Sequence, residues 1–373
     1  MLKIMICGGH FSPALAVIEE LIKNDDYQIY YVGLKNSLEG DKALSLEYLT
    51  IRRLEIPFLS ITTGRLQRFI SLNTLPSLIK TPIGLIQSLL IIQKIKPDII
   101  LSFGGFVALP VTLAGWLMNV RIITHEQTSV LGLANRIICK YAKILCLSFK
   151  DTKKVSERTK FAVTGNPIRK DFFQIHKSDI CNFGNNKLPL IYITGGSQGA
   201  RSINKILSKI VSKMINKYRI IHQCGEANNQ TDYKLLLKVK DNLPLKSQSN
   251  YMIFTHVPPN KVAEIMYNSS LIIGRSGANT VTEIGIMNKP AILIPLPWSA
   301  DNEQFFNALV LEKYGLAKII KQKDLKEDLL IQTIDSIIKR HSAKSMFIKE
   351  GLFKSNAVIR IIEIINTVAK SSS

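Results

Sequence analysis

The stretch that decides the fold is Ile191-Tyr192-Ile193-Thr194-Gly195-Gly196-Ser197-Gln198-Gly199-Ala200. Its β-branched start predicts a buried strand, and its glycines predict a tight turn. A helix is expected next, because apolar residues recur at helical spacing at Ile203, Ile206, Leu207 and Ile210. Strand, glycine turn and helix in this order are typical of a parallel βαβ unit.

The glycine turn also predicts an anion site. Glycines let the backbone approach a phosphate, and the first turn of the next helix offers unpaired N–H groups at the positive end of its dipole. The spacing matches neither G-x-G-x-x-G nor a Walker A loop, which argues against a pyridine-nucleotide oxidoreductase and a P-loop enzyme. The alternative is a strand-to-helix turn that binds nothing.

The same alternation extends in both directions and predicts two α/β domains with parallel sheets. A domain boundary is expected near residues 165–188, where Gly165-Asn166-Pro167 precedes a polar stretch. The apolar spacing of Asn356–Lys370 predicts a final amphipathic helix. Strands are expected near Lys3–Ile6, Gln28–Val32, Asp98–Phe103, Arg121–Thr124, Ile144–Leu147 and Phe161–Thr164, and then near Leu190–Thr194, Arg219–Gln223, Tyr251–Thr255, Leu271–Gly274 and Ala291–Pro295.

Composition narrows the class of protein. A chain of 373 residues is long enough for two domains, and 46% apolar residues exclude a disordered protein. The net charge of +21 predicts an anionic partner, which could be nucleic acid, lipid or a phosphorylated ligand. Five scattered cysteines without a C-x-x-C pair indicate reduced thiols in the cytosol, and the start of the chain lacks the pattern of a signal peptide. The uncharged stretch Ile99–Val120 contains glycines and a proline, so it is interpreted as strand, turn and helix rather than a membrane span.

Two further glycine turns carry candidate site residues. The turn Gly8-Gly9-His10 follows the first expected strand, so His10 is expected at the carboxyl edge of a parallel sheet, where it could take a proton or only cap the turn. The segment Gly274–Glu283 is again strand, turn and helix start, and Glu283 could accept hydrogen bonds from ribose hydroxyls or complement the helix dipole. Amides and carboxylates of residues 301–307 begin another expected helix.

Taken together, four motifs resemble the bacterial MurG family, the UDP-N-acetylglucosamine transferases that convert lipid I to lipid II in peptidoglycan synthesis. The motifs are His125-Glu126-Gln127, Gly165-Asn166-Pro167-Ile168-Arg169, Gly195–Arg201 and Arg275-Ser276-Gly277-Ala278 with Thr280, Val281 and Glu283. The resemblance spans nearly the whole chain. It implies the GT-B fold, an α/β architecture of two Rossmann-like parallel-sheet domains facing across a cleft.

The resemblance also implies roles for the domains. Residues 1–165 would form the acceptor and membrane-docking domain, residues 166–352 the UDP-sugar domain, and residues 353–373 a helix that packs back on the first domain. His10 is the candidate general base, with Glu126 as a second catalytic candidate. The substrate-binding candidates are Gly8, Gly9, Thr128, Arg169, Ser197, Gln198, Gly199, Val257, Ala278, Asn279, Thr280, Val281, Thr282, Glu283 and Gln304.

Within that set, Ser197 and its turn would contact the diphosphate and Arg169 would lie near the nucleotide. Val257 would lie beside the uracil, Glu283 would bind the ribose, and Gln304 would bind the sugar. Helix dipole and arginine would stabilise the leaving UDP, so no metal and no other cofactor is expected. The chain departs from the family in its short Gly8-Gly9-His10 loop, where G-G-T-G-G-H is usual, and in Thr128, where the family has asparagine.

A basic and apolar region, residues 65–96, predicts docking on an anionic membrane surface, with the protein peripheral on the cytoplasmic face. Residues 56–97 contain no acidic side chain, and Arg65, Arg68, Lys80, Lys94 and Lys96 alternate with apolar residues. The alternative for residues 83–95 is a core helix with solvated lysines. Both interpretations are expected to hold in part.

Other functions remain as alternatives. A UDP-sugar 2-epimerase or a glycolipid glycosyltransferase with another acceptor would share the fold, although the H-E-Q segment and the basic apolar region favour a lipid-linked acceptor. A basic nucleic-acid-binding protein would fit the charge of +21. No nucleic-acid partner is expected, because the sequence contains no recognisable RNA-binding motif or zinc finger and the glycine turns would be unexplained.

Overall fold

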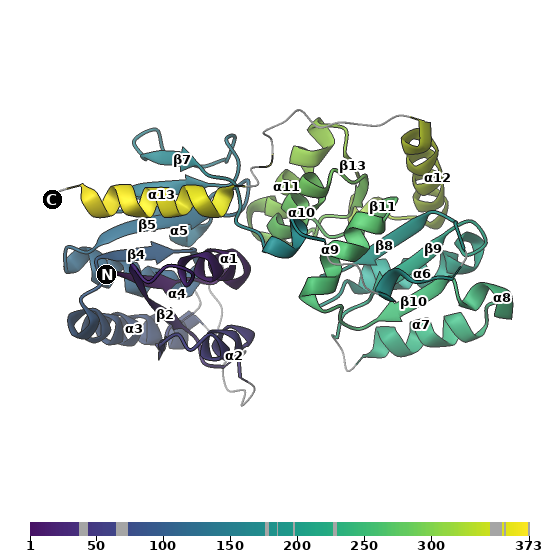
Figure 1. The fold of residues 1–373 in the computed structure, drawn as a ribbon. Helices are drawn as coiled ribbons and strands as arrows, with labels where there is room; N and C mark the ends of the chain where they lie inside the picture. Colours follow the sequence, from purple (N-terminus) through teal and green to yellow (C-terminus); the bar gives the residue numbers. More distant parts are fainter. Residues whose placement is uncertain are drawn as a thin grey trace. The chain divides into compact units, whose positions relative to one another are not determined.

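The computed structural model divides into two compact units, residues 1–169 with 354–373 and residues 170–353 (Figure 1). The structure describes the chain except residues 37–43, 65–73, 176–178, 185, 197, 227–229, 344–352, 354–355 and 372–373, and the side chains of residues 74–81 and 341–343. Arg65, Arg68, Ser197 and the side chain of Lys80 therefore lie outside the described part.

The first unit contains a seven-stranded parallel sheet in the order β3-β2-β1-β4-β5-β6-β7. Its strands are β1 (Leu2–Cys7), β2 (Tyr27–Gly33), β3 (Phe58–Ser60), β4 (Ile99–Ser102), β5 (Arg121–Glu126), β6 (Ile144–Leu147) and β7 (Phe161–Val163). Its helices are α1 (Phe11–Leu21), α2 (Leu46–Arg53), α3 (Thr74–Ile95), α4 (Gly105–Leu117), α5 (Leu133–Ile138) and α13 (Ala357–Lys370).

Alternation along β1 builds a core on each face of this sheet. Ile4 and Ile6 face a cluster completed by α1, α2 and α13. Met5 and Cys7 face the opposite cluster, completed by α3, α4 and α5. A parallel sheet covered on both faces needs apolar residues at every position, which explains the continuous apolar run of β1.

The last helix, α13, belongs to the first unit although it ends the chain. Ile361 and Ile365 are buried in the same cluster as Ile4 and Ile6, and α13 (yellow) lies over this sheet in Figure 1. Two polar contacts fix its position: Arg360 Nη1 donates to the Val163 carbonyl at 2.9 Å, and Tyr27 pairs with Asn366 at 2.9–3.1 Å.

The second unit contains a six-stranded parallel sheet in the order β10-β9-β8-β11-β12-β13. Its strands are β8 (Leu190–Thr194), β9 (Arg219–Gln223), β10 (Tyr251–Phe254), β11 (Leu271–Gly274), β12 (Ala291–Leu293) and β13 (Ala317–Ile319). Its helices are α6 (Arg201–Met214), α7 (Thr231–Asp241), α8 (Leu245–Gln248), α9 (Pro259–Asn268), α10 (Ala278–Met287), α11 (Glu303–Lys313) and α12 (Glu327–Ala343), with 3-10 turns η1 (Lys170–Phe172), η2 (Asp179–Cys181), η3 (Ala300–Asn302) and η4 (Gln322–Asp324). The buried residues of β8, β11 and β12 pack against α6 and α12 in one cluster.

The predicted strands are confirmed with small changes at their ends, and two short strands were missed. β3 and β13 have three residues each and pair at the edges of their sheets, where a strand needs little apolar sequence. The stretch Ile99–Val120 folds as β4, a glycine turn and α4, as predicted. Among the described residues, no helix combines the length and the apolar character needed to cross a membrane.

Candidate functional site

Each sheet has one point where the strand order changes direction, and a pair of glycine turns lies there. In the first unit the point lies between β1 and β4, which end at the turns of residues 8–10 and 103–105. In the second unit it lies between β8 and β11, which end at residues 195–200 and 275–277. Open α/β sheets bind ligands at such switch points, outside the carboxyl ends of the strands.

The two turns of the first unit pack backbone on backbone. Gly9 N–H donates to the Gly104 carbonyl at 2.8 Å. Gly8 has φ +148°, and a Cβ there would lie 2.9 Å from the backbone of Phe103. Only glycine fits this position without moving the neighbouring turn. The short loop therefore delivers His10 directly to the start of α1.

His10 is the N-cap residue of α1 and lies beside the H-E-Q segment that follows β5. Its Nδ1 lies 2.7 Å from Gln127 Nε2. The residue as a whole is half-buried. Burial lowers the pKa of His10 below its ordinary value, and the nearby Glu126 carboxylate opposes this shift. A neutral imidazole at neutral pH follows, which is the form that can accept a proton.

Glu126 is buried and occupied on both carboxylate oxygens. Its Oε1 accepts the Thr128 N–H at 3.0 Å and lies 2.8 Å from the Thr128 hydroxyl. Its Oε2 accepts the Gly132 N–H at 2.8 Å and Asn135 Nδ2 at 3.0 Å. These contacts fold the loop after β5 around the carboxylate, and Thr128 takes part through both its backbone and its side chain.

His125, the first residue of the same segment, is buried beneath the loop. Its Nε2 lies 3.2 Å from the Gly165 carbonyl, and its ring packs 5.5 Å from the ring of Phe103. Burial lowers the pKa of His125 to about 4, so the ring is neutral at neutral pH. This histidine links the segment to Gly165, which begins another predicted motif.

The second unit holds a pocket of about 410 Å³ at its switch point. The N-terminus of α6 opens into it, and the side chains of the N-cap residues of α6 and α10, Ala200 and Gly277, make no capping hydrogen bond. The start of a helix suits a negatively charged ligand, because it is the positive end of the helix dipole. The pocket is lined by Thr194, Gly195, Gly196, Gln198, Gly199, Ala200, Arg201, Ser202, Arg275, Gly277, Thr280, Leu296, Trp298, Gln304 and Gln322.

The glycine turn at this pocket packs against residues at the end of β9. Gly199 has φ +80°, and a Cβ there would lie 2.0 Å from the Cys224 carbonyl oxygen. Gln223 donates to the Gly196 carbonyl at 3.5 Å and accepts from the Tyr192 hydroxyl at 2.7 Å. The turn after β8 is thus supported by β9, which keeps the start of α6 in place.

Arg275 was quoted as part of a motif, but its structural role was missed. Its guanidinium donates to the Ile294 carbonyl at 2.9 Å, to the Ser202 hydroxyl at 2.9 Å and to Gln322 Oε1 at 2.6 Å. It therefore ties the end of β12, the start of α6 and η4 into one wall of the pocket. Arg201 and Trp298 also line the pocket. Arg201 was quoted at the end of the Gly195–Arg201 motif without a role of its own, and Trp298 was not predicted because it belongs to no motif.

Four predicted substrate-binding residues line this pocket: Gln198, Gly199, Thr280 and Gln304. Gln304 Oε1 accepts the Leu296 N–H at 3.1 Å, which fixes the side chain at the rim. Six other predicted residues of the second unit are described but do not line this pocket. Ala278, Asn279, Val281, Thr282 and Glu283 lie on α10, and Val257 lies between β10 and α9.

Burial limits what some of these side chains can do. Val281, Thr282 and Val257 are buried, and the Thr282 hydroxyl donates to the Ala278 carbonyl at 2.8 Å within α10. Such residues can meet a ligand only through backbone or after movement. In the first unit, Arg169 follows the buried residues Pro167 and Ile168 and is itself partly exposed.

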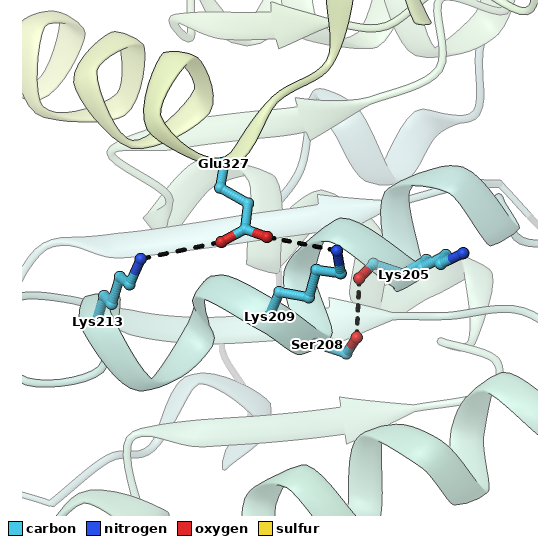
Figure 2. Close-up of polar contacts among 5 residues, drawn as sticks. All are labelled: Lys205, Ser208, Lys209, Lys213 and Glu327. Carbon is cyan, nitrogen blue, oxygen red and sulfur yellow. Dashed lines mark hydrogen bonds and ion pairs between the residues drawn. The ribbon is translucent and has the colours of Figure 1, made fainter.

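A second hollow in this unit, of about 650 Å³, shares the lining residues Ser202 and Gln322 with the first. Its walls carry Lys205, Lys209 and Lys213 of α6 (Figure 2). Glu327 of α12 bridges two of these lysines, at 3.4 Å from Lys209 Nζ and 3.9 Å from Lys213 Nζ. Because these side chains are substantially exposed, we interpret the cluster as a solvated link between α6 and α12.

Metal binding has no obvious location in the described part of the chain. No three His, Cys, Asp or Glu side chains gather there closely enough to hold a metal ion. The cationic side chains that line the pocket of the second unit are those of Arg201 and Arg275.

Comparison with known proteins assigns a domain family to a large part of each unit. Residues 7–146 match the glycosyltransferase family 28 N-terminal domain, and residues 190–361 match its C-terminal domain. The chain is 32% identical over 98% of its length to the UDP-N-acetylglucosamine--N-acetylmuramyl-(pentapeptide) pyrophosphoryl-undecaprenol N-acetylglucosamine transferase of Clostridium perfringens, of which it also covers 98%.

Solved structures share the fold. The crystal structure of Acinetobacter baumannii MurG matches with a TM-score of 0.71 at 24% identity, over 98% of this chain and 100% of that one. A UDP-GlcNAc 2-epimerase from Neisseria meningitidis matches with a TM-score of 0.68 at 14% identity, over 98% and 100% of the two chains. The architecture is the GT-B fold, as predicted, and it is common to transferases and epimerases. By its family domains and its full-length relatives, the chain belongs to glycosyltransferase family 28 and, within it, to the MurG family of N-acetylglucosamine transferases.

Proposed function

We propose that the chain transfers N-acetylglucosamine from UDP-N-acetylglucosamine to the 4-hydroxyl of the muramyl sugar of lipid I, giving lipid II. Membership of the MurG family supports this assignment. The observation that carries the chemistry is the pair of unlike switch points. One presents a neutral imidazole, and the other presents helix N-termini with two arginines at a pocket.

In the proposed reaction His10 is the general base. It takes the proton of the acceptor hydroxyl while that oxygen bonds to the anomeric carbon of the donor. The bond between this carbon and the diphosphate oxygen breaks on the opposite face, so one displacement inverts the α linkage to β. UDP carries away the electron pair of the broken bond.

The second unit would hold the donor. The N–H groups at the starts of α6 and α10 suit the diphosphate, and Arg201 and Arg275 would stabilise the charge that develops on leaving UDP. Gln304 and Thr280 would bind the sugar side of the pocket, and Ser197 would join its turn on the diphosphate. In the same proposal Arg169 lies near the nucleotide, Glu283 binds the ribose, and the segment around Val257 lies beside the uracil.

Glu126 is better suited to hold the H-E-Q loop than to move a proton. Its carboxylate oxygens accept hydrogen bonds from Thr128 N–H, Gly132 N–H and Asn135 Nδ2, so both oxygens are engaged in holding the loop. Its charge favours a protonated His10 next to it. We therefore propose that Glu126 acts through the position and the pKa of His10.

The first unit would dock on the cytoplasmic face of an anionic membrane. Ile83, Ile86 and Leu90 of α3 are exposed, as are Trp116 and Leu117 of the adjoining α4. Exposed large apolar side chains at this density mark an interaction surface, and Lys94 and Lys96 lie exposed at the end of α3. Ile92 and Ile95 of the same helix are buried, so the core interpretation also applies to it.

The test is transfer of label from radiolabelled UDP-N-acetylglucosamine to a lipid I analogue in detergent, with a chelator of divalent metals present. We expect label in a disaccharide lipid and release of UDP. Incubation without the acceptor separates the alternative, because a 2-epimerase would convert the UDP-sugar itself. Epimerised UDP-sugar without labelled lipid would contradict the proposal.

A further inference from the structure

The contact between His10 and Gln127 restricts proton transfer to His10. Gln127 Nε2 lies 2.7 Å from His10 Nδ1, and Gln127 Oε1 is buried without a donor among the residues that the structure describes. In this orientation the amide N–H donates to Nδ1, so a neutral His10 carries its proton on Nε2. A ring in that tautomer has no free lone pair with which to deprotonate a substrate.

A protonated His10 requires the opposite orientation. An imidazolium ring has an N–H at both nitrogens, and an amide N–H facing Nδ1–H at this distance would oppose two donors. Rotating the carboxamide of Gln127 by a half-turn exchanges its nitrogen and oxygen. Oε1 then accepts from Nδ1–H, and in the neutral ring the lone pair lies on Nε2.

We propose that Gln127 is the positioning residue of the base: its carboxamide oxygen accepts from His10 Nδ1–H, selects the tautomer with a free Nε2, and holds the imidazolium formed by proton transfer. This inference rests on the proposed function, because it takes His10 as the base. The proton balance is simple. The acceptor hydroxyl loses its proton to Nε2, Nδ1 keeps its own, and Gln127 neither gains nor loses one.

The groups around His10 already set its pKa, so a neutral amide at Nδ1 can orient the ring without adding a charge. Glu126 already favours the protonated ring, while burial opposes it more strongly. His125 lies nearby but is neutral, since its own pKa is about 4. The turn Gly104-Gly105, packed against the His10 loop, carries no titratable side chain. A neutral acceptor at Nδ1 thus orients the ring without raising its pKa as far as a second carboxylate would.

The tautomer can be measured directly on the whole protein labelled with ¹⁵N in its histidine rings. Correlation spectra report which ring nitrogen carries the proton, and the His10→Asn variant identifies the His10 signals. Above the pKa of His10 we expect protonated Nδ1 and bare Nε2, with the preference lost in Gln127→Met. A neutral His10 with its proton on Nε2 would overturn the inference.

Kinetics supply the second readout. Gln127→Met should lower kcat about tenfold to a hundredfold with little change in the KM for UDP-N-acetylglucosamine, because orientation of the base is lost. Gln127→Glu should move the acid limb of the pH profile upward by about one pH unit, since it places a carboxylate beside the imidazolium. Gln127→Met should move that limb downward. A merely structural residue would not produce opposite shifts.

Gln332→Glu on α12 is the matched control, because this glutamine is exposed and lies in the second unit. It should leave the pH profile unchanged. The two proposals fail separately. Near-normal turnover of His10→Ala would remove His10 from the base role whatever the tautomer. A pH profile that both Gln127 variants leave in place would overturn the positioning role, even if His10 proves essential.

Discussion

The two switch points of the molecule use the same backbone device for different chemistry. In the first unit the glycine turn after β1 packs tightly on the turn after β4 and ends in a titratable side chain, His10. In the second unit the turn after β8 opens into a pocket and leads to α6, whose N-cap residue is Ala200, which has no titratable side chain. The comparison shows that the glycine turn fixes the position of the site, whereas the N-cap residue of the following helix and the space in front of it decide the chemistry.

The largest effect is expected from removing the side chain of the first turn. His10→Ala should reduce kcat by roughly 10²- to 10⁴-fold, because a general base contributes about that much. Steady-state kinetics with saturating donor and acceptor measures the change. Turnover near that of the unchanged protein would contradict the proposal that the first turn supplies the general base.

The second turn is tested by a matched pair of glycine substitutions. Gly199→Ala combines a positive φ with a Cβ 2.0 Å from the Cys224 carbonyl oxygen, so the turn must move. Gly196→Ala has a similar φ of +79°, but no described atom lies within 4 Å of its Cβ. We expect Gly199→Ala to cost several-fold more in UDP affinity and about 1–3 kcal/mol in unfolding free energy, and Gly196→Ala about 1 kcal/mol.

Calorimetric titration with UDP and urea unfolding give both quantities for each variant. Equal losses in the two proteins would mean that close packing under Gly199 is unimportant for the donor site.

The next comparison is between two carboxylates, the buried and hydrogen-bonded Glu126 and Glu327 in its exposed ion pairs. Glu126→Gln should lower the unfolding free energy by about 1–3 kcal/mol, because its amide nitrogen would face donors in a buried site. It should also move the acid limb of the pH profile downward, since the charge that raises the pKa of His10 is lost. Glu327→Gln, at the exposed ion pairs of Figure 2, should cost at most about 1 kcal/mol.

Urea unfolding of both variants, with a pH–rate profile for Glu126→Gln, provides the comparison. A large loss of kcat across the whole pH range with unchanged stability would instead assign Glu126 a direct catalytic role.

A further prediction concerns a buried histidine in each unit, whose effect is confined to acidic pH. Burial lowers the pKa of His125 to about 4 and that of His222 to about 3, below the ordinary value of about 6.5. The unfolded chain therefore binds more protons below pH 6.5, and stability falls as pH falls through this range. Each histidine should contribute up to about 1.4 kcal/mol per pH unit, ending at its folded pKa.

Urea unfolding at a series of pH values measures the slope, and His222→Gln should reduce it. This ring lies between the Tyr251 hydroxyl at 2.9 Å and Asn204 Oδ1 at 3.0 Å. A slope that the substitution leaves unchanged would contradict the assignment to His222.

Sequence patterns predicted most sheet strands and the switch-point turns. Glycines and runs of β-branched residues favour turns and strands through contacts between neighbouring residues, which can be read from the sequence. Periodicity was too weak for β3, which ends in Ser60, and for β13, which contains Lys318, because neither gives a continuous apolar run. The motif residues of the site were predicted through the family, but their partners were not. Gln127 meets His10 from 117 positions away, and Arg275 joins Ser202 and Gln322 across the second unit. Such pairings depend on tertiary packing, which spacing along the chain does not encode.

The same limit applies to side chains on α10. Its sequence predicted a helix start after a glycine turn, and the helix begins at Ala278. Which of its residues face the core was not predicted, and Val281 and Thr282 are buried. A short helix with apolar residues on much of its surface gives no clear polar face from which exposure could be inferred.

The most direct test of the division between the two switch points is the dissociation constant of UDP-N-acetylglucosamine for His10→Ala and Gly199→Ala, measured side by side by calorimetric titration. The account predicts that His10→Ala binds the donor as tightly as the unchanged protein while Gly199→Ala binds it several-fold more weakly. Equal loss of donor affinity in both variants would contradict the account.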